Sequence, residues 1–507
     1  MVDALPAHDV QNGQWFQPAA PAIPDATRAR PVAQRSEDLD WPDRMNPSDA
    51  LFWLLDTVPE LRSTIGIVVI LERTPVRERL WADFRRLASS LPRMRQRVVE
   101  VPFNLAPPEW IDDCQFDLDY HLRSIAVPAP GGMAELLAEL GPFYASPLDR
   151  DRPLWEAYVA EGLLDGRAAV FLKMHHCLMD GVGASQLLAS LFGSRTSALD
   201  VPAVVPTARR STAPSARLWR AARDTLGETF AAEAAAARAL ATALVHPIDT
   251  VHALTAGMRS AVGFGSELIM PRAASPLHYQ RSLSRRLSTF DMALAEIDAA
   301  RGALGATNND IVLTIVSGAL HRWHTSRGAD VKELRALVPV SIRNALDAAA
   351  GNRIALLAIS LPIGEPNPID RLRLIQERMG RVKSDRRAVL YPWLARALLL
   401  LPFAIAIEMG RQQTGRTNVV CTNVSGPRHC CYLAGETIEK IYPYGPLVGD
   451  HPVAIALYSY RDAMYVGLDV DPLAMNDLEH FRDAFAESYA EVVNVAQHVD
   501  PALRRST

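Results

Sequence analysis

The chain has 507 residues, of which 49% are hydrophobic and 22% are charged, and its formal net charge is −4. This length is sufficient for two or more domains with a large core, and the charge balance lacks the basic excess of a nucleic-acid-binding protein. The five cysteines have neither the density of a disulfide scaffold nor a zinc-ligand spacing, so we expect a reducing, cytosolic compartment. No signal peptide is apparent, and the longest uncharged apolar run, residues 397–407, is shorter than the ~20 residues that span a bilayer. We therefore expect a protein that can rest on a membrane surface without crossing it.

The first 200 residues divide into a leader and an α/β region. Residues 1–40 are rich in Pro, Ala, Asp and Arg without periodicity, and we interpret them as a disordered leader. In residues 41–200 predicted strands and helices alternate, which is typical of a layered α/β domain. The predicted strands are 63–71, 125–127, 154–159 and 168–174, and the predicted helices are 76–91, 133–144 and one around 187–191.

A change in composition then separates this region from a second one. Residues 201–275 begin as a Pro/Ser-rich linker and continue as a helical connector that is alanine-rich over 216–244. One face of the connector is apolar, so it packs either on the protein body or on a membrane or lipid droplet. Its polar face is not strongly basic, which favours the protein body.

Residues 276–507 resume the α/β pattern and form the second predicted domain. The predicted strands are 287–290, 334–340, 354–361 and 418–423, followed by a hairpin of 453–460 and 464–468 around Arg461-Asp462. The predicted helices are 292–300, 309–327, 369–382 and a final amphipathic helix capped by Asn476. We expect Gly328 to end the second of these helices.

The most distinctive motif is HHxxxDG, which occupies residues 175–181 and directly follows an apolar predicted strand. Adjacent side chains of an extended chain point to opposite faces, so His175 and His176 cannot both line one cavity. The pattern therefore favours one imidazole base over a two-histidine metal site. The alternative is that a histidine at a strand end is only a packing residue.

Further motifs occur along the chain in a fixed order. They are NPSDALF at 46–52, LPRMRQR at 91–97, FDLDYH at 116–121, PLW at 153–155, ND at 309–310, VPVSIR at 338–343 and NVSGP at 423–427. With HHxxxDG, these stretches resemble the wax ester synthase/acyl-CoA:diacylglycerol O-acyltransferase family of HHxxxDG acyltransferases over roughly residues 41–500. The resemblance implies an α/β fold of two chloramphenicol-acetyltransferase-like domains, joined by a helical connector, with the active-site channel between them.

The resemblance also implies a reaction and residue roles. The expected activity is acyl-CoA-dependent O-acyl transfer that forms triacylglycerol from diacylglycerol, wax ester from a fatty alcohol, or both. His176 matches the catalytic position, and an imidazole with an ordinary pKa of about 6.5 suits a general base. His175 is then a packing or orienting neighbour. Asp180 pairs with an arginine to hold the loop, or alternatively orients the imidazole, and Cys177 is a covalent alternative that strand alternation turns away from His176.

Other motif residues are expected to support the site. Gly181 allows a tight turn into the following helix. The polar candidates for an oxyanion donor are Asn309, Ser341 and Ser425, although Asn309 is equally suited to capping its helix, with Asp310 favouring the helix N-terminus. Pro153, Leu154 and Trp155 shape the wall near the histidines or pack in the core. The basic residues available for CoA phosphates are Arg343, Lys383 and Arg386, each of which is also an ordinary surface residue.

These expectations define the partners. We expect acyl-CoA as a co-substrate with no permanently bound cofactor and no metal, diacylglycerol or fatty alcohol as acceptor, no nucleic acid, and a cytoplasmic protein associated peripherally with a membrane or lipid droplet. Two alternatives remain: a polyketide- or peptide-associated acyltransferase or condensation protein that uses carrier-bound acyl groups, and a non-catalytic lipid-droplet-binding protein. The intact HHxxxDG motif counts against the second.

Overall fold

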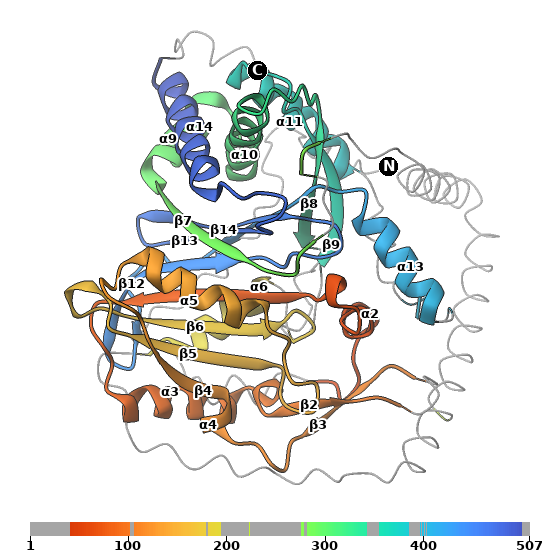
Figure 1. Cartoon of the computed structure of the whole chain (residues 1–507), viewed down its shortest axis with the longest axis vertical. Coiled ribbons are helices and arrows are strands. Elements are labelled where there is room, and N and C mark those ends of the chain that lie inside the picture. The colour runs from red at the N-terminus through yellow and green to blue at the C-terminus, as the bar shows by residue number, and fades with distance from the viewer. Residues whose placement is uncertain are drawn as a thin grey trace, which may run out of the picture.

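The computed structural model describes residues 41–101, 106–178, 181–193, 223, 275–277, 281–341, 354–384, 396, 398–399, 401 and 403–498. The predicted leader and nearly all of the predicted connector lie outside these residues. The described part contains two six-stranded sheets, each with its own hydrophobic core, and one two-stranded sheet (Figure 1). The protein is therefore a two-lobed, mixed α/β protein, as the sequence predicts.

The first sheet has the strand order β11-β12-β1-β6-β5-β4. Its neighbouring strands β1 (Thr64–Leu71) and β6 (Ala168–His175) pair antiparallel, with Thr64 opposite His175. Both strands are almost entirely buried, as expected for uninterrupted apolar runs. The other elements of this lobe are β4 (Leu122–Ala126), β5 (Trp155–Glu161), α3 (Arg77–Ser90), α4 (Leu118–His121), α5 (Met133–Ala145) and α6 (Gly181–Leu191).

The second sheet has the strand order β7-β14-β13-β10-β8-β9. Strands β13 (Val453–Tyr460) and β14 (Ala463–Val470) form the predicted hairpin, and Arg461 in its two-residue turn takes a left-handed φ of 54°. Helices α9, α10, α11 and α14 gather on the side of this sheet away from the first lobe (Figure 1). The bounds are β7 (Arg286–Ala293), β8 (Leu334–Ser341), β9 (Ile354–Leu361), β10 (Val419–Ser425), α9 (Leu294–Leu304), α10 (Asn308–Thr325), α11 (Pro368–Ser384) and α14 (Leu478–His498).

Two of the three predicted helix caps are wrong. Helix α10 is capped by Thr307 and not by Asn309: the Thr307 hydroxyl oxygen accepts from the Asp310 amide, and the Asp310 carboxylate accepts from the Thr307 amide at 2.9 Å. This reciprocal pair satisfies two amides at once, which a cap by Asn309 would not do. Gly328 closes this helix as predicted: it takes a left-handed φ of 65°, its amide donates to the Thr325 carbonyl oxygen at 2.9 Å, and the Ala329 amide donates to that of His324 at 3.0 Å. The last helix begins directly after Asp477, so Asn476 is one residue too early to cap it.

Two strands of the C-terminal half complete the first sheet. Strand β12 (Glu436–Tyr444) pairs antiparallel with β1, and β11 (Tyr432–Leu433) pairs with β12. The Tyr144 hydroxyl ties this crossing in place, since it lies 2.9 Å from the carbonyl oxygen of Thr64 and 2.8 Å from that of Gly445. The two sheets therefore do not divide the chain at a single point, and the walls between the lobes come from both halves.

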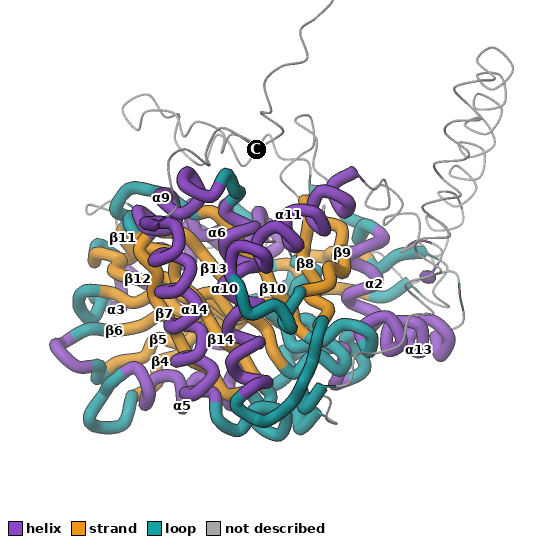
Figure 2. Tube along the Cα trace, turned by 90° about the horizontal axis from the view of Figure 1, so that it is seen from above, coloured by secondary structure: helices purple, strands orange, loops and turns teal. Residues whose placement is uncertain are grey.

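Two further helices lie at one end of the molecule, α2 (Pro47–Leu55) and α13 (Phe403–Thr414) (Figures 1 and 2). Leu51 and Leu55 of α2 pack with Leu398 and with Met409 of α13. None of the described helices is both long and apolar enough to cross a membrane. The small sheet consists of β2 (Gln96–Val99) and β3 (Glu109–Asp112), and short 3-10 turns lie at Pro59–Leu61, Pro92–Met94 and Leu164–Gly166.

Candidate active site

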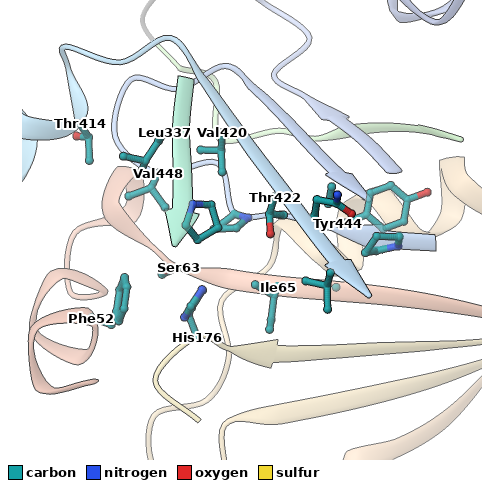
Figure 3. Close-up of a pocket in the computed structure, with 18 of the residues that line it drawn as sticks. Phe52, Ser63, Ile65, His176, Leu337, Thr414, Val420, Thr422, Tyr444 and Val448 are labelled. Atoms are coloured by element: carbon teal, nitrogen blue, oxygen red, sulfur yellow. The ribbon is translucent and has the colours of Figure 1, made fainter. Parts of the chain in front are cut away.

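A cavity of about 250 Å³ lies between the two lobes (Figure 3). Elements of both halves line it: α2, β1, α6, β8, α13, β10, the end of β12 and β13. Most lining side chains are apolar, and the polar ones are Ser48, Ser63, His176, Ser185, Gln413, Thr414, Thr417, Thr422, Asn423, Tyr444 and Tyr458. An apolar cavity with a few convergent polar groups is the usual form of a small-molecule site.

The second sheet opens where it meets this cavity. Strand β10 pairs with β13 along its whole length, but it pairs with β8 only at Val419 and Val420. Beyond these residues β8 and β10 separate, and Thr422 and Asn423 of β10 line the cavity, as does Pro339 of β8. The separation of two neighbouring strands therefore provides one wall.

His176 lies on the cavity wall, in the turn that follows β6. Its amide donates to the Ser63 carbonyl oxygen at 2.8 Å, which fixes the backbone. Its ring stacks on Phe52 of α2, with ring centroids 4.8 Å apart and planes 27° apart (Figure 3). Of the two adjacent histidines, only His176 lines the cavity, in agreement with strand alternation.

His175 points to the other side and is 1% exposed. Its Nδ1 accepts from the Cys177 amide at 3.1 Å, and its Nε2 lies 3.1 Å from Oδ1 of Asp56. Burial by itself raises the pKa of the Asp56 carboxyl, but the contact with His175 and the charges of Arg150 and Arg62 outweigh it and hold the pKa below its usual value. Asp56 is therefore a carboxylate at neutral pH.

Cys177 is 1% exposed and does not line the cavity. Burial raises the pKa of its thiol well above the usual value, and the nearby carboxylates of Asp49 and Asp56 raise it further. A thiol must ionise to act as a strong nucleophile. Its position and its pKa both make Cys177 unsuited to covalent catalysis.

Pro153, Leu154 and Trp155 do not line the cavity; they lie beside the histidine strand in the same sheet, where Trp155 pairs with Met174. Trp155 is fully buried, stacks on His121 with centroids 4.7 Å apart, and donates its indole N–H to the Met94 carbonyl oxygen at 2.7 Å. The Leu154 carbonyl oxygen accepts from the His175 amide at 3.0 Å. These contacts are those of a motif that packs in the core, and not of one that shapes the cavity wall.

The other predicted site residues are only partly brought together. Asn309 is exposed and outside the cavity lining, but its Oδ1 accepts from Nδ2 of Asn423, which does line it, at 2.9 Å. Asp310 is buried in the capping box of α10. Ser425 ends β10 with an exposed side chain, and its carbonyl oxygen lies 3.4 Å from the Ser185 hydroxyl.

Some predicted positions fall outside the described residues or side chains. Asp180, Arg343 and Arg386 are outside the described residues. Ser341 ends β8 opposite Ile354, and Lys383 lies in α11, but the side chains of both are not described. Gly181 begins α6. Within the described residues, no group of three or more His, Cys, Asp or Glu side chains is arranged to hold a metal ion.

Several residues of the site have no chemical signature in the sequence. Ser185 and Tyr458 lie 3.3 Å apart, oxygen to oxygen, across the lobe boundary. Phe52 of α2 and Asp56, the C-cap of that helix, contact the two histidines. Two site residues carry one signal in the sequence: Phe52 lies within NPSDALF and Asn423 within NVSGP. Membership of a motif, however, does not say which of its side chains reaches the site.

Two lobes of mixed α/β structure, with the second histidine of HHxxxDG on a cavity between them, define the two-lobed, chloramphenicol-acetyltransferase-like class of fold. The first condensation domain of the CDA synthetase shares this fold, with a TM-score of 0.60 at 15% identity over 91% of this chain and 98% of that one. A wax ester synthase/diacylglycerol acyltransferase from Marinobacter aquaeolei VT8 also has a TM-score of 0.60, at 24% identity over 90% of this chain and 100% of that one.

Sequence comparison narrows the class to one family. Residues 45–312 match the wax ester synthase/diacylglycerol acyltransferase catalytic domain, and residues 350–492 match the WS/DGAT C-terminal domain. A Mycobacterium tuberculosis protein named as a probable diacylglycerol O-acyltransferase is 30% identical over 450 residues, which are 87% of this chain and 93% of that protein. The chain therefore belongs to the wax ester synthase/diacylglycerol acyltransferase family, and it is an acyltransferase.

Proposed function

We propose that this acyltransferase uses long-chain acyl-CoA to form triacylglycerol from diacylglycerol, wax ester from a fatty alcohol, or both. The observation that carries the proposal is the His176 imidazole on the wall of a mostly apolar cavity between the lobes. Apolar walls suit acyl chains, because burying one CH₂ group is worth about 0.8 kcal/mol. The name of the mycobacterial relative supports diacylglycerol as an acceptor.

His176 acts as the general base in this proposal. One imidazole nitrogen takes the acceptor hydroxyl proton as the hydroxyl oxygen attacks the thioester carbonyl carbon. The tetrahedral intermediate then collapses, the carbon–sulfur bond breaks, and the imidazolium returns the proton to the CoA thiolate. Atoms and charges balance without a covalent acyl-enzyme, which agrees with the buried position of Cys177.

The oxyanion of the intermediate needs a fixed donor about 3 Å away. Asn309, Ser341 and Ser425 are the donors suggested by the motifs. We propose an indirect role for Asn309: its side-chain oxygen accepts one amide N–H of Asn423, and Asn423 lines the cavity. This hydrogen bond would orient the second amide N–H of Asn423 as the donor to the oxyanion. For Asp180 we retain the proposal that it anchors the HHxxxDG loop through an arginine.

A panel of acceptors tests the function. Radiolabelled oleoyl-CoA is supplied with diolein, hexadecanol or no acceptor, in the absence of any carrier protein, and the lipid products are separated. We expect label in triacylglycerol, wax ester or both. No ester product, with activity appearing only when an acyl-carrier protein is added, would favour the alternative of a carrier-dependent condensation enzyme, whose fold the chain shares. Lipid binding without ester formation under either condition would favour a non-catalytic role.

The products are too apolar to leave into water, so we further propose that the enzyme works at a membrane or lipid-droplet surface. Large apolar side chains are exposed at the start of α13 and just before it: Leu401 is 38% exposed, Phe403 47% and Ile405 48%. The opposite end of α13 contributes Gly410 and Thr414 to the cavity. One helix thus runs from an exposed apolar patch to the wall of the site, which suits the delivery of a lipid.

A further inference from the structure

Helix α2 and its C-cap residue contact both histidines of HHxxxDG. Phe52 stacks on the His176 ring, and Asp56, four residues later, lies against His175. Asp56 is the C-cap of α2 and keeps helical backbone angles (φ −63°, ψ −17°), so it lies on the same face as Phe52, and the two side chains reach both rings. The ring of Trp53 also meets His175 edge-on, with centroids 6.5 Å apart.

The hydrogen bonds of the turn depend on the His175 side chain. The Cys177 amide can only donate, so Nδ1 of His175, 3.1 Å away, must accept and carry no proton. A neutral His175 ring therefore carries its proton on Nε2, the nitrogen 3.1 Å from the Asp56 carboxylate. The N–H does not point straight at that oxygen, so the contact acts through charge and proximity more than through a linear hydrogen bond.

The same turn fixes the base. The His176 amide bonds to Ser63, and the Leu178 amide bonds to the His175 carbonyl oxygen at 3.1 Å. If the His175 ring changed tautomer, Nδ1 would become a donor facing the Cys177 donor, and this side of the turn would lose its hydrogen bond. Because His176 lies inside this turn, its ring would move relative to the substrate.

We propose that Asp56 is a positioning residue for the reaction: it selects the Nε2–H tautomer of His175 and so holds the turn that carries His176. This inference rests on the proposed role of His176 as the base. Asp56 is itself held by Arg150, whose guanidinium lies 3.4 Å from the carboxylate and 3.5 Å from the centre of the Trp53 ring. Arg150 also contacts Glu100 at 3.3 Å.

Glu100 provides a matched control. Its carboxylate contacts Arg150 and accepts the Trp53 indole N–H at 3.0 Å, as part of the same cluster, but no described contact joins it to His175. We compare Asp56→Leu, Asp56→Asn and Glu100→Leu by kinetics with oleoyl-CoA and by thermal melting. Asp56→Leu should lower kcat about 10²-fold, the scale of a small misplacement of a reacting group, with KM for both substrates changed less than about twofold. Asp56→Asn keeps an acceptor oxygen and should lose less, and Glu100→Leu should stay near wild type.

Two further measurements keep the proposal testable if Asp56→Leu folds poorly. In a His175→Asn background, Asp56→Leu should cause no further loss of kcat, because Asp56 acts through His175. Nitrogen-15 shifts of labelled histidine should show His175 with its proton on Nε2 in the wild type. A proton on Nδ1, additive losses in the double variant, or equal kinetics of Asp56→Leu and Glu100→Leu would each overturn the proposal. If His176→Ala retained activity, the base assignment would fail instead, which is a separate outcome.

Discussion

The Phe52 ring covers one face of the His176 imidazole, with centroids 4.8 Å apart. This stack holds the ring against the cavity wall. Phe52→Leu keeps the wall apolar but removes the flat surface. We expect kcat to fall about tenfold, since a stacked pair is worth about 0.5–1.5 kcal/mol beyond its buried area, while Phe52→Tyr stays within about threefold. Equal losses in both variants would show that the stack does not orient the base.

Cys177 should be dispensable for chemistry. Its thiol is buried with a raised pKa. Cys177→Ser should therefore retain at least about a third of the wild-type kcat, with the loss attributable to a buried hydroxyl. Intact-protein mass spectrometry after mixing the wild type with oleoyl-CoA should show no acyl adduct. An adduct on Cys177 that forms and decays at the turnover rate would replace direct transfer by a covalent mechanism.

Acid should destabilise the protein through His121. Burial lowers the pKa of His121 to about 4, although its bond to the Trp155 carbonyl oxygen opposes this. The folded pKa lies below the unfolded value of about 6.5, so the unfolded state binds more protons as pH falls from 6.5 towards 4. The stability is complete above pH 6.5, and about 1 kcal/mol of it is lost from this residue by pH 5.5.

Urea unfolding at pH 7.5 and pH 5.5 tests this for the wild type and His121→Asn. The variant is expected to be less stable at pH 7.5, because it loses the stacking of the ring on Trp155 and Phe116. Its further loss between the two pH values should be smaller than that of the wild type by about 1 kcal/mol. If the wild type and His121→Asn lost the same free energy of unfolding between pH 7.5 and 5.5, His121 would not titrate as described.

The exposed patch at the start of α13 should contact lipid. Phe403→Glu/Ile405→Glu should reduce co-sedimentation with phosphatidylcholine–diolein vesicles at least about tenfold, because burying such a side chain is worth about 1.5–3 kcal/mol. Leu473→Glu is the control, since Leu473 is 56% exposed elsewhere on the molecule. Both variants should melt at the wild-type temperature. Equal binding of both variants and the wild type would place the lipid contact elsewhere.

The elements that could be predicted are those whose own residues show a clear apolar pattern in the sequence. Strands β1 and β6 are uninterrupted apolar runs, and the β13–β14 hairpin has a short polar turn between two such runs. Strand β12 escaped prediction because Glu436–Tyr444 carries charges and Pro443, and only its partner β1 explains its conformation. Helix α2 is short and begins with a proline, so its apolar face gives a weak periodic signal.

The site could be predicted only around the histidines. Strand alternation correctly separates His175 from His176, because side-chain direction in a strand is a local property. The cavity walls come instead from segments far apart in the chain, such as Phe52, Gly410 and Asn423. The PLW motif shows the converse, since a distinctive sequence next to the site serves the core: Trp155 is fully buried. Residue type and spacing reveal neither which distant segments form the cavity wall nor that the PLW motif packs in the core.

The role of His176 as the base is tested most sharply by the activity of His176→Ala with oleoyl-CoA and the better acceptor. His480→Ala, which alters an exposed histidine on α14, is the control. General-base catalysis is worth about 10²–10⁴-fold. We predict that His176→Ala loses at least about 10²-fold in kcat while it binds acyl-CoA and melts like the wild type, and that His480→Ala is unaffected. A folded His176→Ala protein that retains a tenth or more of the wild-type kcat would contradict the assignment of His176 as the base.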